Sequence, residues 1–314
     1  MIARAALLAA AVALAPPAVA AASDLRAQLK ELATLDTRVQ TAGWRLARGN
    51  AVYCREVAPG IGLQLFDAAS YSNPEAVRET LALRADIAVG AVATDGPAAR
   101  AGLAAHAPLS AVAGQPTVSL PGAKPDDYAR LAGLHDRLDA ELRQSGRASF
   151  ALVDGASLEF AGEPACVTRF EMLTKGSRAA ADGKRVVIGR KLVEELPDEL
   201  LAAALAHELA HNLLGHRERL NATGRSWGKV KATEREADRL MPWLLANAGY
   251  DPRAAVRFFA VWGPKHDLGL FATPDHDGWK ARVKRVTAEI GVMRAAQARR
   301  GGAADWSRDF RRAS

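Results

Sequence analysis

The stretch LAAALAHELAHNLLGH, residues 201–216, places two histidines and a glutamate in a run that is otherwise almost wholly apolar. On an α-helix, residues four positions apart lie on one face, so His207 and His211 can present two imidazole nitrogens to one point. Zinc binds such nitrogens and, at catalytic sites, keeps a position for water near a carboxylate that can take its proton. Glu208 directly follows the first histidine. The pattern therefore predicts two zinc ligands and a general base.

A zinc site needs a third protein ligand, and His216 is a nearby candidate. If the helix continued past His211, His216 would point about 180° away from His207. The pattern that uses a third histidine also places it six residues after the second, beyond a glycine turn, whereas His216 follows by five. We therefore expect His216 to be a helix-end or surface histidine.

Glu234 is the better candidate for the third ligand. It lies in ATEREADRL (232–240), and Asp238 follows it by one helical turn. A carboxylate ligand with an acidic partner one turn away can bind the metal and hold a ligating histidine in the right tautomer. Glu236 projects elsewhere on this helix and is expected to be solvated. The alternative, a hydrogen-bonded core cluster without metal, would need polar partners within an Ala/Leu-rich helix.

HELAH (207–211) followed by EREAD (234–238) resembles the M48 family of zinc metallopeptidases, which carry HExxH on one helix and an ExxAD-type motif on the next. The resemblance implies that His207, His211 and Glu234 ligate one zinc ion. It also implies that Glu208 is the catalytic base and that Asp238 supports His207. The strand VVIG (186–189) would edge the cleft and pair with an extended substrate.

A further feature of this family is a His-Pro-x4-Arg segment after the second helix. Here His276-Asp277 takes the His-Pro place, without the proline, and Arg282 falls at the matching distance. The resemblance implies that Arg282 supports the zinc site and that His276 stabilises the oxyanion or approaches the metal. A helix-capping histidine is the alternative for His276.

The first residues resemble a secretory signal peptide. Arg4 gives a basic start, an apolar stretch follows from Ala5 to Ala15, and small residues at Ala18 and Ala20 suit cleavage near residues 20–22. This segment is too short to span a bilayer, so we expect an exported protein, periplasmic or secreted, without stable membrane insertion after cleavage. Export permits disulfides, so one bond between the only two cysteines, Cys54 and Cys166, is predicted, with two free thiols as the alternative.

The 314 residues are 49% hydrophobic, which is typical of a globular chain with a sizeable core. The net charge of +7 could suggest nucleic acid, but basic and acidic residues alternate, as in KVKATEREADRL (229–240). No aromatic pattern for base stacking accompanies them. We therefore expect no nucleic-acid partner, and we expect the basic C-terminal end to be a solvated tail.

Residues 92–116, VATDGPAARAGLAAHAPLSAVAGQP, resemble part of a bacterial PDZ domain, and the resemblance covers roughly residues 80–165. A hairpin through Asp154-Gly155 follows a predicted helix at 126–146. PDZ domains bind extended peptides by adding a strand to a sheet edge, which implies recruitment of polypeptides. A purely structural insertion is the alternative.

The expected fold class is α+β: a mainly helical zincin-type metallopeptidase domain with a small edge sheet, plus an inserted PDZ-like module. The expected divisions are a signal peptide (1–22), a helical part of the peptidase domain (23–80), the PDZ-like domain (81–165), the zinc-binding peptidase domain (166–300) and a basic tail (301–314).

The predicted function is hydrolysis of peptide bonds in unfolded or misfolded proteins, with Zn²⁺ as cofactor and Glu208 as base. The alternative is a chaperone-like or peptide-binding factor with a latent or structural zinc site. A structural site has no use for a general base beside an open coordination position, so Glu208 favours the peptidase. The oligomeric state and the cleavage preference cannot be read from the sequence.

Overall fold

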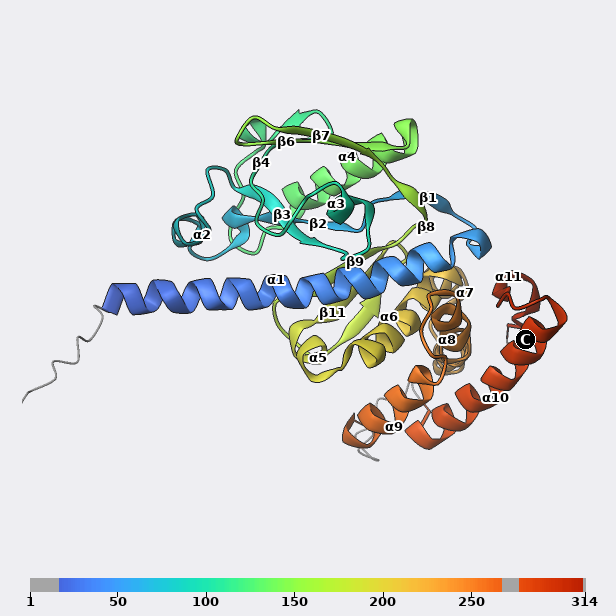
Figure 1. Cartoon of the computed structure of the whole chain (residues 1–314). Helices are drawn as coiled ribbons and strands as arrows, with labels where there is room; N and C mark the ends of the chain where they lie inside the picture. The colour runs from blue at the N-terminus through green and yellow to red at the C-terminus, as the bar shows by residue number, and fades with distance from the viewer. Residues whose placement is uncertain (1–16, 267–276, 313–314) are drawn as a thin grey trace, which may run out of the picture.

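The long helix α1 (Pro17–Gly49) runs between a helical body and a smaller, sheet-rich module (Figure 1). The computed structural model describes residues 17–266 and 277–312. α1 thus begins six residues before residue 23, where the helical part of the peptidase domain was expected to begin. The predicted signal peptide lies outside the described residues, except for its last six residues, which begin α1. Among the described helices, none is both long and apolar enough to cross a lipid bilayer.

The helices that follow residue 189 build the body. Its centre is α6, which carries HELAH; residues 200–206 of α6 are all buried, as expected for a helix that is apolar on every side. α6 packs against α1, α8 and α9, and α10 packs against α8 and α9. These helices are α5 (Arg190–Glu195), α6 (Asp198–Leu213), α7 (His216–Thr223), α8 (Trp227–Asn247), α9 (Ala254–His266), α10 (Trp279–Arg299) and α11 (Trp306–Asp309).

A three-stranded sheet lies beside α6 in the order β10-β11-β9. β11 (Arg185–Gly189) pairs parallel with β9 (Arg169–Leu173) and antiparallel with β10 (Ala179–Ala181). The prediction that residues 186–189 edge the cleft and pair with substrate is therefore wrong, because both edges of β11 are already paired. β10 and β9 are the edge strands of this sheet; β10 contacts α6 and β9 contacts α1.

The small module spans residues 57–166 and has its own core. An antiparallel sheet in the order β5-β4-β6-β7 packs with α4. Two two-stranded sheets, β2-β3 and β1-β8, complete the module. The predicted hairpin through Asp154-Gly155 is confirmed as β6-β7. The elements are β1 (Val57–Gly60), β2 (Leu63–Asp67), α2 (Pro74–Leu81), β3 (Ile87–Val92), α3 (Pro97–Arg100), β4 (Leu109–Val112), β5 (Gln115–Pro116), α4 (Ala129–Ser145), β6 (Arg147–Leu152), β7 (Ser157–Ala161) and β8 (Glu163–Cys166).

The boundary predicted at residue 81 does not separate two cores. β2 pairs with β3, so residues on both sides of that boundary form one ladder. Ile61 and Leu65 are buried in the same cluster as Phe150. The module therefore begins near residue 57, because strand pairing joins segments that composition alone separates.

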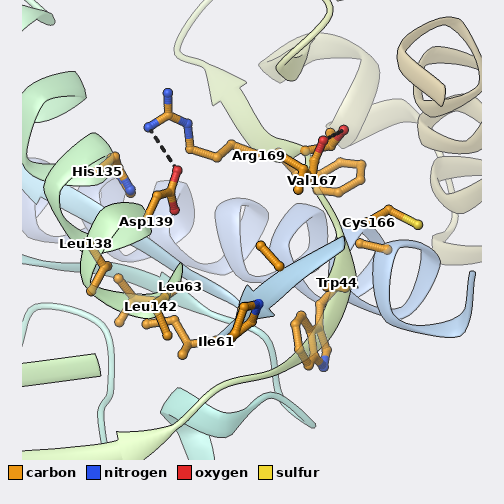
Figure 2. A pocket seen from close by; sticks show the side chains of 18 of the residues that line it. Trp44, Ile61, Leu63, His135, Leu138, Asp139, Leu142, Cys166, Val167 and Arg169 are labelled. Atoms are coloured by element: carbon orange, nitrogen blue, oxygen red, sulfur yellow. Dashed lines mark hydrogen bonds and ion pairs between the residues drawn. The ribbon is translucent and has the colours of Figure 1, made fainter. Parts of the chain in front are cut away.

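The module and the body enclose a cavity of 610 Å³. Figure 2 shows part of its lining: His135, Asp139 and Leu142 on α4, Trp44 on α1, and Arg169 on β9, whose guanidinium reaches Asp139. Arg169 Nη1 donates to Asp136 Oδ1 at 2.9 Å, which ties the body to α4. Residues 58–64 line the same cavity.

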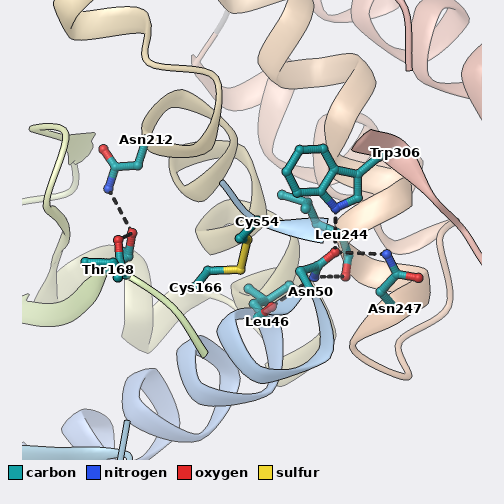
Figure 3. Close-up of a disulfide and its surroundings, with 10 residues drawn as sticks. Leu46, Asn50, Cys54, Cys166, Thr168, Asn212, Leu244, Asn247 and Trp306 are labelled. Carbon is teal, nitrogen blue, oxygen red and sulfur yellow. Dashed lines mark hydrogen bonds between the residues drawn. A yellow bond between two sulfur atoms is a disulfide. The ribbon is translucent and has the colours of Figure 1, made fainter. Parts of the chain in front are cut away.

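The disulfide Cys54–Cys166, predicted from the sequence, is present and joins the end of α1 to the end of β8 (Figure 3). Beside it, Trp306 Nε1–H donates to Asn50 Oδ1 at 2.9 Å. Trp306 and Phe310 are buried in the main core, so the predicted solvated tail is wrong for this segment. Gly301 and Gly302 have φ angles of 72° and 108°, a left-handed backbone that lets the chain turn after α10.

Candidate metal centre

Two neighbouring helices, α6 and α8, carry the predicted zinc ligands. α6 begins with Asp198 and Glu199 in its first turn, where negative charge favours the helix dipole. Directly after His211, the side chain of Asn212 accepts from Gly183 N–H at 2.7 Å and donates to the Arg185 carbonyl at 3.1 Å. The helix is therefore anchored to the β10-β11 hairpin at the ligand position.

The three predicted ligands converge. His207 Nε2 lies 3.3 Å from His211 Nε2 and 3.2 Å from Glu234 Oε2, and His211 Nε2 lies 3.4 Å from Glu234 Oε1. This is the one group of three or more metal-ligating side chains found within the described residues. His207 is buried, whereas His211 and Glu234 are partly exposed. The structure therefore brings together the ligand set predicted from the sequence.

These separations fit a zinc ion. Ligands held at about 2 Å in tetrahedral geometry lie about 3.3 Å from one another. His207 Nε2 and His211 Nε2 lie 3.3 Å apart, which matches an edge of such a tetrahedron. The Glu234 carboxylate lies 3.2 Å from the first nitrogen through Oε2 and 3.4 Å from the second through Oε1. Two imidazole nitrogens and one carboxylate are also a donor set that zinc uses at catalytic sites. Geometry and chemistry thus agree with zinc.

Asp238 lies behind His207, as the sequence predicted. Asp238 Oδ1 is 3.3 Å from His207 Nδ1, an ion-pair contact without the alignment of a good hydrogen bond. Arg282 Nη2 donates to Asp238 Oδ1 at 2.5 Å, and Arg285 Nη1 donates to Asp238 Oδ2 at 2.9 Å. The Arg282 guanidinium also stacks over the Phe259 ring, 4.1 Å from its centroid. The predicted role of Arg282 near the site is therefore supported by direct contact with Asp238.

The pKa values of His207 and His211 shift in opposite directions in the metal-free protein. Burial lowers the pKa of His207, but Asp238 and Glu234 outweigh it and raise the pKa to about 10. Burial lowers the pKa of His211 to about 3, although Glu234 opposes this. Because a zinc ligand must be a neutral imidazole, metal binding at this site has to displace a proton from His207.

His216 and Glu236 lie inside the protein, which corrects two predictions. His216 was expected at a helix end or on the surface, and it does begin α7, but it is buried. Gly215, with φ 62°, ends α6 and redirects the chain, so His216 Nδ1 lies 2.9 Å from His211 Nδ1. Glu236 was expected to be solvated, but it contacts His216 Nε2 at 3.0 Å and is buried. A glycine after a helical run was the signal for this turn.

Glu208 and His276 are the remaining site residues predicted from the sequence. Glu208 is partly exposed within an otherwise buried stretch of α6, next to His207. Burial would lower the pKa of Arg282, but Asp238, Glu234 and Glu208 raise it, so Glu208 lies near this group of charges. His276, predicted to assist catalysis, lies outside the described residues.

The family model described as Peptidase family M48 matches residues 178–230. This match supports an M48 metallopeptidase. It covers β10, β11, α5, α6, α7 and the start of α8, so it includes His207, Glu208 and His211 and stops four residues before Glu234. M48 metallopeptidases use a metal, typically zinc, in agreement with the ligand geometry. A comparison with curated proteins found no match.

Proposed function

We propose that the chain is a zinc-dependent endopeptidase that cleaves unfolded or misfolded proteins. The observation that carries this proposal is the convergence of His207, His211 and Glu234 on one point, with Glu208 next to His207 on α6. The M48 match over residues 178–230 supports the same reaction class.

A bound zinc ion supplies Lewis-acid chemistry, which polarises a carbonyl group and makes a water molecule easier to deprotonate. Glu208 accepts the proton of the attacking water and returns it to the amine nitrogen that leaves. Its partial exposure gives it access to water, while its neighbour His207 stays buried. Asp238 holds His207 in place, and the guanidinium of Arg282 keeps Asp238 ionised.

The sheet beside α6 offers a place for an extended polypeptide. Because β11 is paired on both edges, the outer edge of β10 is the one we assign to substrate pairing. Ala179–Ala181 present small side chains there, so the backbone of a substrate can approach closely. This assignment replaces the one made from the sequence.

The small module supplies a second contact for polypeptides, as its PDZ-like sequence suggests. Leu65 N–H on β2 donates to His135 Nε2 on α4 at 3.3 Å. The residues just before it, 58–64, line the 610 Å³ cavity with α4. We propose that a substrate segment enters this cavity between β2 and α4. A binding factor with a latent zinc site is the rival function, and this cavity, which contains no predicted zinc ligand, is the observation that favours it.

We also propose that the protein is exported. The basic and apolar N-terminal segment supports this, as does the Cys54–Cys166 disulfide, because such bonds persist in oxidising compartments.

The decisive experiment compares the parent chain with Glu208→Gln. Zinc per chain and cleavage of an unfolded protein such as casein are measured for both. We expect zinc in both proteins and cleavage by the parent alone, since the amide cannot accept a proton from water. Cleavage by purified Glu208→Gln would refute the role of Glu208. Zinc in both without cleavage by either would favour the binding factor.

A further inference from the structure

We propose that His216 is a positioning residue for the metal centre: together with Glu236 and Arg219, it holds His211 in the tautomer that turns the Nε2 lone pair toward the metal. The inference rests on the proposed function only in taking His211 as a zinc ligand. It assigns a role to three side chains that neither donate a ligand atom nor act as the base.

The three side chains form a continuous series of contacts leading away from the site. His211 Nε2 faces His207 and Glu234, and its other ring nitrogen, Nδ1, lies 2.9 Å from His216 Nδ1. His216 Nε2 lies 3.0 Å from Glu236 Oε2. Arg219 donates to both carboxylate oxygens of Glu236, at 2.9 and 3.3 Å. Each ring nitrogen in the series therefore faces one defined neighbour.

The contacts determine where the protons lie. Glu236, which accepts two hydrogen bonds from a guanidinium, is a carboxylate and can only accept, so His216 carries its hydrogen on Nε2. A neutral imidazole has one N–H, which leaves a lone pair on His216 Nδ1. The short contact between the two Nδ1 atoms then requires the hydrogen to be on His211 Nδ1. His211 Nε2 is left with its lone pair directed at the metal site.

The opposite tautomer would work against metal binding. If His211 carried its hydrogen on Nε2, an N–H group would point at the place where zinc is bound, and His211 Nδ1 would offer a lone pair to the lone pair of His216. Partners that fix the tautomer of a ligating histidine commonly raise metal affinity by 10- to 100-fold, on the order of magnitude found for other zinc proteins.

The turn between α6 and α7 brings His216, Arg219 and Glu236 together. Gly215, in the left-handed conformation, separates α6 from α7, so His216 comes back against the last turn of α6. Arg219 lies one helical turn after His216 on α7, so both reach Glu236 from one side. His216 and Glu236 are each only 1% exposed. Burying two polar groups is costly unless they are bonded, and an apolar residue at either place would avoid that cost.

The test uses the full chain and four variants. In His216→Asn the amide oxygen lies near the place of Nδ1 and can still accept from His211, whereas in His216→Gln the amide lies near the place of Nε2. His216→Leu removes both groups. His135→Leu is the matched control, because His135 is also buried but lies on α4 of the small module, in a cavity lining that contains none of the predicted zinc ligands. Zinc affinity is measured by competition with a chromophoric chelator, after circular dichroism confirms that each variant is folded.

We expect zinc affinity to fall 10- to 100-fold in His216→Leu and His216→Gln, and to stay within about threefold of the parent in His216→Asn and His135→Leu. Equal losses in His216→Asn and His216→Gln would overturn the proposal, even if His216→Leu failed to fold. So would parent-like affinity in all three His216 variants.

A second measurement needs neither zinc nor activity. A long-range ¹H–¹⁵N correlation spectrum of the metal-free parent reports which nitrogen of His211 carries hydrogen, with His211 assigned by comparison with His211→Asn. Hydrogen on Nδ1 is expected, and hydrogen on Nε2 would overturn the proposal. A parent chain that bound no zinc would instead refute the proposed function, so the two failures are distinguishable.

Discussion

Replacing Trp306 tests whether the C-terminal segment is part of the folded body. Trp306 is 7% exposed, and its indole N–H donates to Asn50 Oδ1 at 2.9 Å. Asn50 also donates from Nδ2 to the carbonyls of Leu46 on α1 and Leu244 on α8, so it joins these helices to α11 (Figure 3). We predict that Trp306→Ala lowers the free energy of unfolding far more than a change in a solvated tail could.

The magnitude follows from the area that the indole buries. A buried tryptophan covers roughly 200 Å², which at about 25 cal/mol per Å² corresponds to about 5 kcal/mol. Trp306→Ala should therefore cost about 3–5 kcal/mol. Trp306→Phe keeps most of the apolar contact and loses one hydrogen bond, for a cost of about 1 kcal/mol. Asn50 Oδ1 keeps a second donor in that variant, Asn247 Nδ2 at 2.9 Å.

Trp227 provides the matched control. It begins α8 and is 62% exposed, so Trp227→Ala should change the free energy of unfolding by less than about 0.5 kcal/mol. Urea unfolding is followed by far-ultraviolet circular dichroism, because each substitution removes a fluorophore. All proteins are kept oxidised and at the same zinc content. Losses that agree within about 0.5 kcal/mol for Trp306→Ala and Trp227→Ala would refute the placement of the C-terminal segment in the core.

Two further predictions concern pH and the disulfide. Burial lowers the pKa of His135 to about 3, so the folded state holds a neutral ring while the unfolded chain takes up a proton near pH 6.5. The stability that neutral His135 contributes is complete above pH 6.5 and is lost as the pH falls toward 3, by about 2 kcal/mol at pH 5. The urea midpoint of the parent should therefore fall over this pH range. An equal fall in His135→Gln would contradict the prediction. Reducing Cys54–Cys166, which are 112 residues apart, should cost about 4–5 kcal/mol in urea unfolding; unchanged midpoints with and without reductant would contradict this.

The ligand set could be predicted from the sequence because it depends on local geometry. His207 and His211 are one helical turn apart, and periodicity places them on one face whatever surrounds the helix. Glu234 could be selected because Asp238 follows it by one turn on a second helix. Their convergence to 3.2–3.4 Å depends on how α6 packs against α8, which no local pattern contains.

The errors all involve contacts between distant segments. β11 was expected at a sheet edge, but its short apolar run does not reveal that β10 and β9 pair with both sides. The module was expected to begin at residue 81, but the pairing of β2 with β3, which lie on either side of α2, places its start near residue 57. Trp306 and Phe310 are flanked by basic residues, which suggested a solvated tail, yet two aromatic side chains so close together were a signal for burial.

Glu236, which was expected to be solvated, shows that two faces of α8 contact different groups. Glu234 and Glu236 are two residues apart on α8, so they point in different directions, which made solvent the simple expectation for Glu236. The structure instead places α7 on that side, because Gly215 turns the chain after α6. Glu234 therefore faces the metal site while Glu236 faces His216.

The charges around the centre explain why two different supports can orient the two histidines. Asp238 contacts His207 directly and accepts hydrogen bonds from Arg282 and Arg285. Glu236 reaches His211 only through neutral His216 and is paired with Arg219. Each orienting carboxylate is thus matched by guanidinium groups on its far side, so it fixes a ring without adding unbalanced negative charge. Under the proposed function, the carboxylates of Glu234 and Glu208 lie beside a doubly charged zinc ion, one as its ligand and the other as the base.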